Sequence, residues 1–403
     1  MSSEAAAAGR DSILVTGAVV ANGALGYLVQ VVAGLLLTAG EYRDLGVVWA
    51  AVFVVAGAMT GLQQEVTRDV RPGSGGTPLS RVIIVMALLF AVPLAVAALL
   101  APSASEVLLP MAVAAAAIAV HGVVTGTAFG TGNARFAALA LVLEGVIRTV
   151  LLLAVIVAVG GSALPLGLGI ALPFIAAALL IAPALRRRTG RVGLTEQPRT
   201  VAINIAHTLL ASAASAALVS GYPLFLSLLT SVDAVELGAF VFTFTLTRAP
   251  LVVIMLGLQS FLVAEFHSRP PTRARLVLSL SALVGGVALL AVLAAALGPG
   301  ILARFFDEGF ALAPAAIFFI VLSAAPLCVL CVTGPLALAR GQHGTFAAGW
   351  IAAATAAVGV LAVGGLALPL PFLTIAVGAI MVGPVVGAIL HIAGLCRRLS
   401  SED

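Results

Sequence analysis

The sequence predicts an all-α polytopic membrane protein with about twelve transmembrane helices in two halves of six. Three observations lead to this class. The chain of 403 residues is 62% hydrophobic and only 9% charged, whereas a soluble domain needs far more polar surface. Apolar runs of about 20 residues, the length that crosses a bilayer as a helix, recur along the whole chain. An internal repeat divides these runs into two equal sets.

The expected spans are separated by short loops that carry turn-forming residues, as in RPGSGGTP and HSRPPT. In chain order, the spans cover approximately residues 12–38, 45–66, 81–101, 107–129, 136–160, 163–185, 202–230, 237–261, 276–298, 311–338, 345–367 and 370–395. The first span has no small-residue cleavage site followed by a soluble domain, so we expect it to be retained and not removed as a signal peptide.

Arginine accounts for all 20 basic residues, and its placement predicts the orientation of the chain. With the N-terminus in the cytoplasm, nearly all loop arginines fall inside, and only Arg43 and Arg304 fall outside. The outer loops carry acidic residues instead, namely Glu41, Asp44, Glu106, Asp233, Glu236, Asp307 and Glu308. This bias predicts cytoplasmic termini and a place in the cytoplasmic (inner or plasma) membrane. It also accounts for the pI of about 9.5 without a nucleic-acid partner.

Two pairs of similar segments reveal the internal repeat. LLLTAGEYRDLG (35–46) resembles SLLTSVDAVELG (227–238), and an apolar span with the tripeptide Gly-Leu-Gln follows each. Further along, TGTAFGTGNARFAAL (125–139) resembles TGPLALARGQHGTFAAG (333–349). Six spans per half is an even number, so the halves have the same orientation and are related by an axis along the membrane normal.

The repeat sets the expected domain boundaries. We expect residues 1–190 to form an N-terminal six-helix bundle and residues 200–403 a C-terminal one. Residues 191–199 then form a cytoplasmic linker, which belongs to the basic stretch RRRTGRVGLTEQPR.

The turns GTGNARF and RGQHGTF, together with the LG…GLQ second spans and the six-plus-six layout, resemble the multidrug/oligosaccharidyl-lipid/polysaccharide (MOP) exporter superfamily. Within it, the chain is most similar to the polysaccharide biosynthesis (Wzx-type) flippases. The resemblance implies two bundles around a central cavity, alternating access, and a polyprenyl (pyro)phosphate-linked glycan as the transported lipid. Lipid II flippases of the superfamily usually carry two further C-terminal helices and arginines in the first span. This chain shows neither feature.

Two arginines lie near the middle of predicted spans, Arg148 in the fifth and Arg248 in the eighth. A central arginine costs about 2.5–3.5 kcal/mol to insert, so each must face protein or a wet cavity. Because the guanidinium fork suits phosphate, both are candidate substrate-binding residues. Arg148 has an alternative, an i,i+4 ion pair with Glu144. Arg248 has no acid within one turn, so we expect it to line the cavity.

Glu144 is either the partner of Arg148 or, if transport is driven by a proton or sodium ion, the coupling carboxylate. Asn22 and Gln30 lie on roughly one face of the first span, and Tyr222 lies in the outer half of the seventh. In the superfamily these two spans line the cavity and bend, which the neighbouring Pro223 would permit. Asn22, Gln30 and Tyr222 are therefore candidate substrate-binding residues. The alternative role is hydrogen bonding between helices.

The sequence contains no Walker motif, HExxH, GxSxG or acidic metal pair, so we expect no enzyme activity, cofactor or metal. Cys328 and Cys331 lie in an apolar run and are expected to pack. The leading hypothesis is a monomeric flippase in the bilayer for a lipid-linked oligosaccharide of the cell envelope, because two midplane arginines against one carboxylate favour an anionic lipid. The alternatives are a proton- or sodium-coupled multidrug exporter of the same superfamily and a membrane-embedded glycosyl- or acyltransferase or scaffold.

Overall fold

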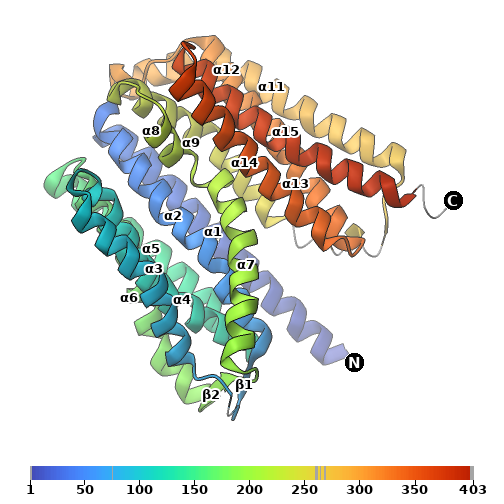
Figure 1. Ribbon diagram of the computed structural model, residues 1–403. Coiled ribbons are helices and arrows are strands. Elements are labelled where there is room, and N and C mark those ends of the chain that lie inside the picture. The colour runs from blue at the N-terminus through green and yellow to red at the C-terminus, as the bar shows by residue number, and fades with distance from the viewer. Residues whose placement is uncertain (1, 75, 259–261, 264, 267–268, 400–403) are drawn as a thin grey trace. The chain divides into compact units, whose positions relative to one another are not determined.

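The computed structural model describes residues 2–399 except residues 75, 259–261, 264 and 267–268, and side chains from residue 14 to residue 395 with a few gaps. The described chain is almost entirely α-helical (Figure 1). Within it, eleven helices are long and apolar enough to cross a membrane. This confirms the predicted all-α polytopic class. The eighth expected span corresponds to helix α9, and Gln259 of its Gly-Leu-Gln tripeptide lies outside the described residues.

By their contacts, the helices form two compact units. Unit 1 comprises Met1–Val29 and Val47–Ala216, and unit 2 comprises Gln30–Gly46 and Ala217–Asp403. The chain therefore passes from one unit to the other inside helices α1, α2 and the seventh span. These units are defined by contacts, whereas the halves 1–190 and 200–403 are inferred from sequence similarity. The two halves and the central cavity stay predictions.

Unit 1 is built around helix α4, which packs against α3, α5 and α6. The elements that lie wholly or mostly in it are α1 (Ser2–Leu36), α2 (Ala39–Asp69), β1 (Val70–Pro72), α3 (Leu79–Leu100), η1 (Pro102–Ala104), α4 (Ser105–Gly130), α5 (Ala134–Val159), α6 (Ala163–Thr189), β2 (Val192–Leu194) and α7 (Pro198–Val219). Glycines let α2 and α4 approach closely, since a Cβ on Gly126 would lie 2.8 Å from the Gln63 carbonyl oxygen. Small residues play this part widely between membrane helices.

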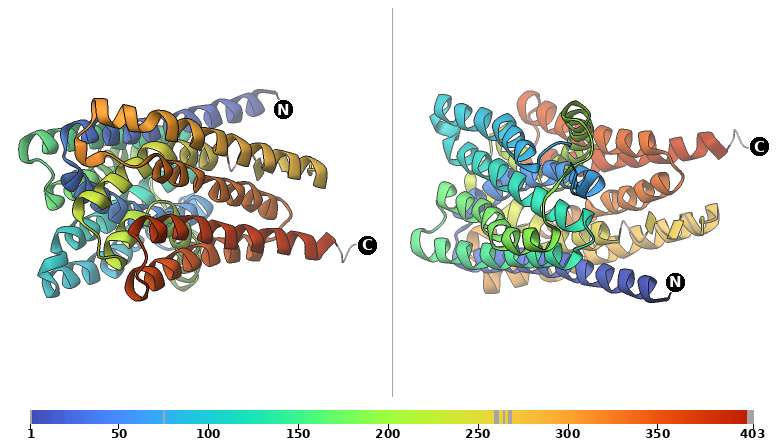
Figure 2. Two further views of the ribbon diagram at one scale, coloured as in Figure 1. Left: turned by 90° about the horizontal axis from the view of Figure 1, so that it is seen from above. Right: turned by 90° about the horizontal axis from the view of Figure 1, so that it is seen from below.

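Unit 2 has helices α14 and α15 side by side along their lengths (Figures 1 and 2). Its elements are α8 (Tyr222–Leu229), α9 (Ala234–Gly257), α11 (Arg273–Phe305), η2 (Glu308–Phe310), α12 (Pro314–Leu322), α13 (Ala324–Ala339), α14 (His343–Ala367) and α15 (Phe372–Leu399). Helix α13 contacts α9, α11, α14 and α15, so it forms the centre of the unit.

The two turns that carry the internal repeat have the same backbone geometry. Gly132 and Gly341 have φ angles of 69° and 70°, a left-handed conformation that glycine adopts without strain. In each turn the next residue donates its N–H to the carbonyl five residues earlier: Asn133 to Ala128 at 2.7 Å, and Gln342 to Ala337 at 2.9 Å. The sequence similarity of these segments therefore reflects a shared helix–turn–helix structure.

The linker is held in unit 1 by a two-stranded antiparallel sheet, in which Val70 pairs with Leu194. Beside the sheet, Asp69 accepts hydrogen bonds from the Thr195 hydroxyl and from the Glu196 backbone N–H. Arg68 bridges Glu65 and Glu196 at 2.6 and 3.0 Å. The linker thus forms an ordered end of unit 1 that is tied to α2.

The seventh expected span is two helices, α7 and α8, separated at Ser220 and Gly221. Pro223 stands in the first turn of α8 and has no N–H to donate to the carbonyl of Val219, so the α7 helix cannot continue through this position. Before the break, α7 packs on α2: a Cβ on Gly61 would lie 2.6 Å from the Leu209 nitrogen.

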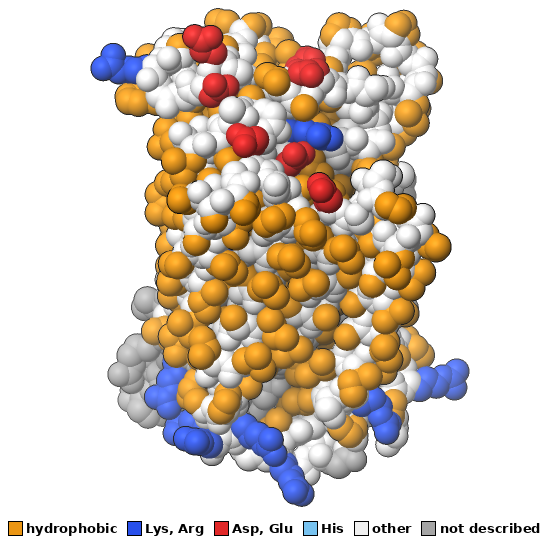
Figure 3. Space-filling view, turned by 90° about the vertical axis from the view of Figure 1, so that its left-hand side faces the viewer, with side chains coloured by type: hydrophobic (Ala, Val, Ile, Leu, Met, Phe, Trp, Pro, Cys, Tyr) orange, Lys and Arg blue, Asp and Glu red, His pale blue; other side chains and the backbone are white. Residues whose placement is uncertain are grey.

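Hydrophobic side chains form a broad band on the face seen in Figure 3; acidic side chains with some arginine lie towards its upper end, and arginines lie towards its lower end. Helix α11 of unit 2 also has an apolar outer surface, since Leu278 and Leu289 are 71% and 61% exposed. Such a band suits the lipid tails of a bilayer.

Candidate functional site

Two of the buried charges of unit 1 lie in a closed network on α1 and α5. Glu144 and Arg148 are an ion pair with side chains that are both 3% exposed. Arg148 Nη2 donates to Asn22 Oδ1 at 2.6 Å, and Asn22 Nδ2 donates to Glu144 Oε2 at 2.6 Å. Each of the three side chains thus contacts the other two. We call this set, Asn22, Glu144 and Arg148, the Glu144 network.

Local sequence explains why the Glu144 network can form. The i,i+4 spacing places Glu144 and Arg148 on one face of α5. Gly145 leaves room on α5 for the Asn22 side chain, because a Cβ on this residue would lie 3.1 Å from Asn22 Oδ1. The rings of Trp49 and Phe53 lie 5.4 and 5.2 Å from Arg148 Cζ, within cation–π range. The arginine is therefore both neutralised and packed.

Arg248 of unit 2 is in the opposite situation. It is 2% exposed, and its Nε, Nη1 and Nη2 atoms have no hydrogen-bond partner among the described residues. The ring of Phe244, one turn earlier on α9, lies 4.8 Å from its Cζ. A buried charge without a hydrogen-bonded partner is costly. This guanidinium therefore has a full set of N–H donors available for an anion.

Tyr222 lies close to the Arg248 environment. Its ring stacks on Phe244 at 5.5 Å between centroids, and its hydroxyl donates to the backbone carbonyl of Ala376. Phe244 thus contacts both predicted residues, Tyr222 and Arg248. The Tyr222 hydroxyl thus has a partner and its ring is buried, so its predicted role in substrate binding stays a prediction.

Gln30 lies apart from the other candidates. Its Oε1 accepts a hydrogen bond from the Tyr42 hydroxyl at 2.7 Å, within the segment Gln30–Gly46 that belongs to unit 2. Tyr42 in turn packs edge-on against Phe242 and Phe310, at 5.0 and 5.6 Å between centroids. We call Gln30–Gly46 the hairpin segment. Gln30 and Asn22 share a helix but do not share a site.

Cys328 and Cys331 are both buried in α13. No group of three His, Cys, Asp or Glu side chains that could hold a metal ion occurs in the part of the chain that the structure describes. The residues that sequence reasoning missed are aromatic: Trp49, Phe53 and Phe244, which pack against the buried arginines. Phe244 could have been found, because it precedes Arg248 by one helical turn.

Solved transporters share this fold. An inward-facing multidrug resistance MATE family transporter of the MOP superfamily has a TM-score of 0.70, covers 94% of this chain and 95% of its own, and is 14% identical. The lipid II flippase MurJ has a TM-score of 0.69 at 11% identity, over 95% of this chain and 87% of its own. A Pyrococcus furiosus MOP transporter reported to have a binding pocket of reverse polarity has a TM-score of 0.56 at 17% identity, over 100% of this chain and 93% of its own. The chain has the fold of the MOP superfamily.

Mycobacterial proteins are similar in sequence, although no family model matches. The uncharacterized protein Rv3630 of Mycobacterium tuberculosis is 30% identical over 92% of this chain and 89% of its own length. A second protein of that organism, Rv1510, is 34% identical over 194 residues, which cover 48% of this chain and 44% of its own. The chain belongs to the same family as Rv3630.

Proposed function

We propose that this protein is a transporter that moves a polyprenyl (pyro)phosphate-linked saccharide across the cytoplasmic membrane by alternating access, without enzyme activity. The fold supports transport, since both a multidrug transporter and a lipid II flippase share it. The observation that carries the choice of substrate is Arg248, a buried guanidinium with no acceptor among the described residues.

The balance of buried charge supports an anionic substrate. In unit 1 the charge of Arg148 is cancelled by Glu144, whereas in unit 2 Arg248 forms no ion pair with a carboxylate of the described residues. A phosphate or diphosphate supplies both the missing charge and paired oxygen acceptors that match the guanidinium fork. Phe244 beneath Arg248 holds the plane of the fork in place.

The fold supports a multidrug exporter equally well, and Glu144 remains the candidate residue for proton or sodium coupling in that case. An uncompensated arginine, however, repels the organic cations that such an exporter would carry, and a low dielectric strengthens the repulsion. For this reason we favour the anionic lipid over a cationic drug.

The test is a leaflet-resolved assay with purified protein in liposomes. A fluorescent polyprenyl diphosphate-linked sugar is scored by its access to a quencher that cannot cross the bilayer. Because a hydrogen bond to a charged group contributes about 1.5–3 kcal/mol, Arg248→Gln should slow flipping tenfold or more. The matched control is Arg43→Gln, which removes an arginine that is 41% exposed and pairs with Asp44 at the surface. A folded Arg248→Gln protein that flips at the wild-type rate refutes the proposal, and export of a cationic dye instead favours the multidrug alternative.

A further inference from the structure

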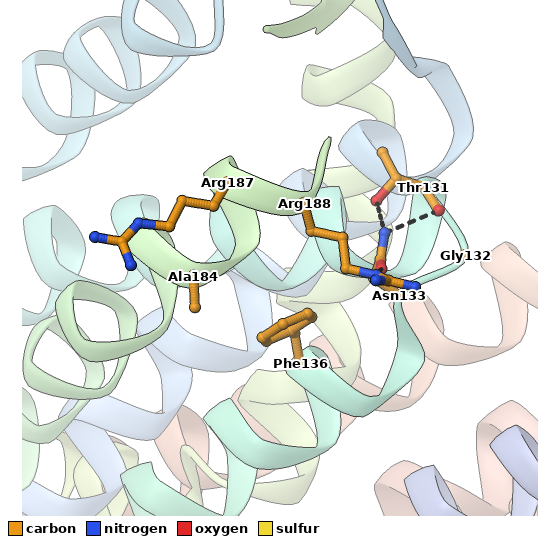
Figure 4. A pocket seen from close by; sticks show the side chains of 7 residues that line it. All are labelled: Thr131, Gly132, Asn133, Phe136, Ala184, Arg187 and Arg188. Carbon is orange, nitrogen blue, oxygen red and sulfur yellow. Dashed lines mark hydrogen bonds between the residues drawn. The ribbon is translucent and has the colours of Figure 1, made fainter. Parts of the chain in front are cut away.

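One end of unit 1, predicted to face the cytoplasm, contains an open hollow of about 650 Å³. It lies between the turn that joins α4 to α5 and the C-terminal end of α6. Its lining residues are Thr131, Gly132, Asn133, Phe136, Ala184, Arg187 and Arg188. Figure 4 shows Arg188 extending over Asn133, with Phe136 below and Arg187 extending past Ala184 on the other side. We call it the arginine hollow.

Arg188 is held in place within the arginine hollow. Asn133 Oδ1 accepts a hydrogen bond from Arg188 Nε at 3.3 Å. The Asn133 amide is itself fixed, because its Nδ2 donates to the Thr131 carbonyl at 3.1 Å and to the Thr131 hydroxyl at 3.0 Å. Among the described residues, this Nε contact is the hydrogen bond that Arg188 makes, and its two terminal nitrogens have no acceptor there. Asn133 thus positions the fork of Arg188.

The charge around the hollow is positive and uncompensated. Among the described residues, no ion pair links an acid to any of the arginines at this end of α5 and α6, which are Arg135, Arg186, Arg187, Arg188 and Arg191. Acids elsewhere in the unit have other partners: Glu65 and Glu196 pair with Arg68, and Asp69 accepts hydrogen bonds from the linker. A group of this charge attracts anions from the membrane surface.

Apolar side chains continue from the hollow along the outside of the unit, and we call these residues, Phe136, Leu139, Leu180 and Ala184, the apolar lane. Phe136 and Ala184 form the apolar lining of the hollow. One turn further into the membrane, Leu139 on α5 is 47% exposed and Leu180 on α6 is 62% exposed. A ligand that fits both parts has an anionic head and a hydrocarbon tail.

We propose that the arginine hollow binds the phosphate of an anionic phospholipid of the surrounding bilayer, with the acyl chains lying along the apolar lane. This site is separate from Arg248 and does not depend on what the protein transports. The shared chemistry is a phosphate ester, and the lane distinguishes a lipid from free phosphate.

The test measures lipid binding to the full-length protein by native mass spectrometry, with phosphatidylglycerol, phosphatidylcholine or inorganic phosphate as the probe. Each arginine near an anionic surface contributes about 1 kcal/mol, so Arg187→Gln/Arg188→Gln should weaken phosphatidylglycerol binding about thirtyfold. Phosphatidylcholine should bind weakly to both proteins. The matched control, Arg71→Gln/Arg81→Gln, removes two exposed arginines of the same unit outside the hollow and should leave the affinity within about threefold.

Three results overturn the proposal. They are equal losses in the arginine and control variants, equal affinity for both phospholipids, and binding of inorganic phosphate as tight as that of phosphatidylglycerol. Asn133→Ala supplies a second variant that keeps every charge. It should weaken phosphatidylglycerol binding severalfold, because Arg188 loses the side chain that positions it. An unchanged affinity in both the Asn133 variant and the double arginine variant also contradicts the site.

Discussion

Replacing Arg148 with methionine while Glu144 stays in place should destabilise unit 1 strongly. Both side chains are 3% exposed, so the lone carboxylate would remain buried with only Asn22 to hydrogen-bond it. Removing one partner of a buried ion pair costs about 3–5 kcal/mol, whereas replacing both with apolar residues is often neutral. We therefore expect Glu144→Leu/Arg148→Met to recover most of the free energy of unfolding that Arg148→Met loses.

The assay is a double-mutant cycle of denaturant unfolding in detergent, followed by tryptophan fluorescence. Trp49 reports on this site because its ring lies 5.4 Å from Arg148 Cζ. The chain has two tryptophans, so a Trp350→Phe background leaves Trp49 as the reporter. A coupling energy of about 2–3 kcal/mol between the two substitutions is expected. If the costs of the two single substitutions simply add, the pair does not stabilise unit 1 and the reasoning is wrong.

Two further predictions concern packing and orientation. Gly238→Ala should lower the free energy of unfolding by about 1–3 kcal/mol, because the added Cβ would lie 1.8 Å from the Ala39 carbonyl oxygen. The control is Gly286→Ala, whose added Cβ would have no atom within 4 Å, and it should be neutral or mildly stabilising. Equal melting temperatures for the two variants would contradict this. A single cysteine introduced within residues 191–199 should be labelled only by a thiol reagent added on the cytoplasmic side. A cysteine introduced beside Asp233 should be labelled only by a reagent added outside, and the reverse pattern would overturn the predicted orientation.

The regular parts of the fold could be predicted because they depend on local sequence. The length of each apolar run of residues is enough to indicate where a helix can cross the bilayer. The repeated turns carry Gly132 and Gly341 at the two positions that require a positive φ. Pro223 marks the interruption of the seventh span, because a missing N–H acts on the carbonyl four residues earlier whatever the tertiary structure.

The contacts between helices could be predicted only in part. Spacing places Glu144 and Arg148 together, but the participation of Asn22 depends on how α1 meets Gly145. Asn22 and Gln30 share one face of an ideal helix, yet contacts assign them to different units. Helix periodicity describes neighbours on one helix, whereas the partners of a side chain are chosen by packing between helices.

The hairpin segment has a consequence for how the protein is made. Unit 2 combines Gln30–Gly46 with Ala217–Asp403, so one of its parts leaves the ribosome well before the other, and Val47–Ala216 of unit 1 is made in between. The rings that pack on Tyr42, those of Phe242 and Phe310, are among the later residues. Gly34 and Gly46 likewise pack against later residues, Phe242 and Val241 respectively.

During insertion, the hairpin segment is therefore in the membrane well before its permanent neighbours exist. Until they arrive, local hydrogen bonds such as the one between Gln30 and Tyr42 protect its polar groups from lipid. Unit 2 can therefore assemble only after Ala217–Asp403 has been made and packs against the earlier hairpin segment. A ribosome stalled before Phe310 would leave this part of the chain without its apolar cover, and such intermediates are the ones that membrane quality control should recognise.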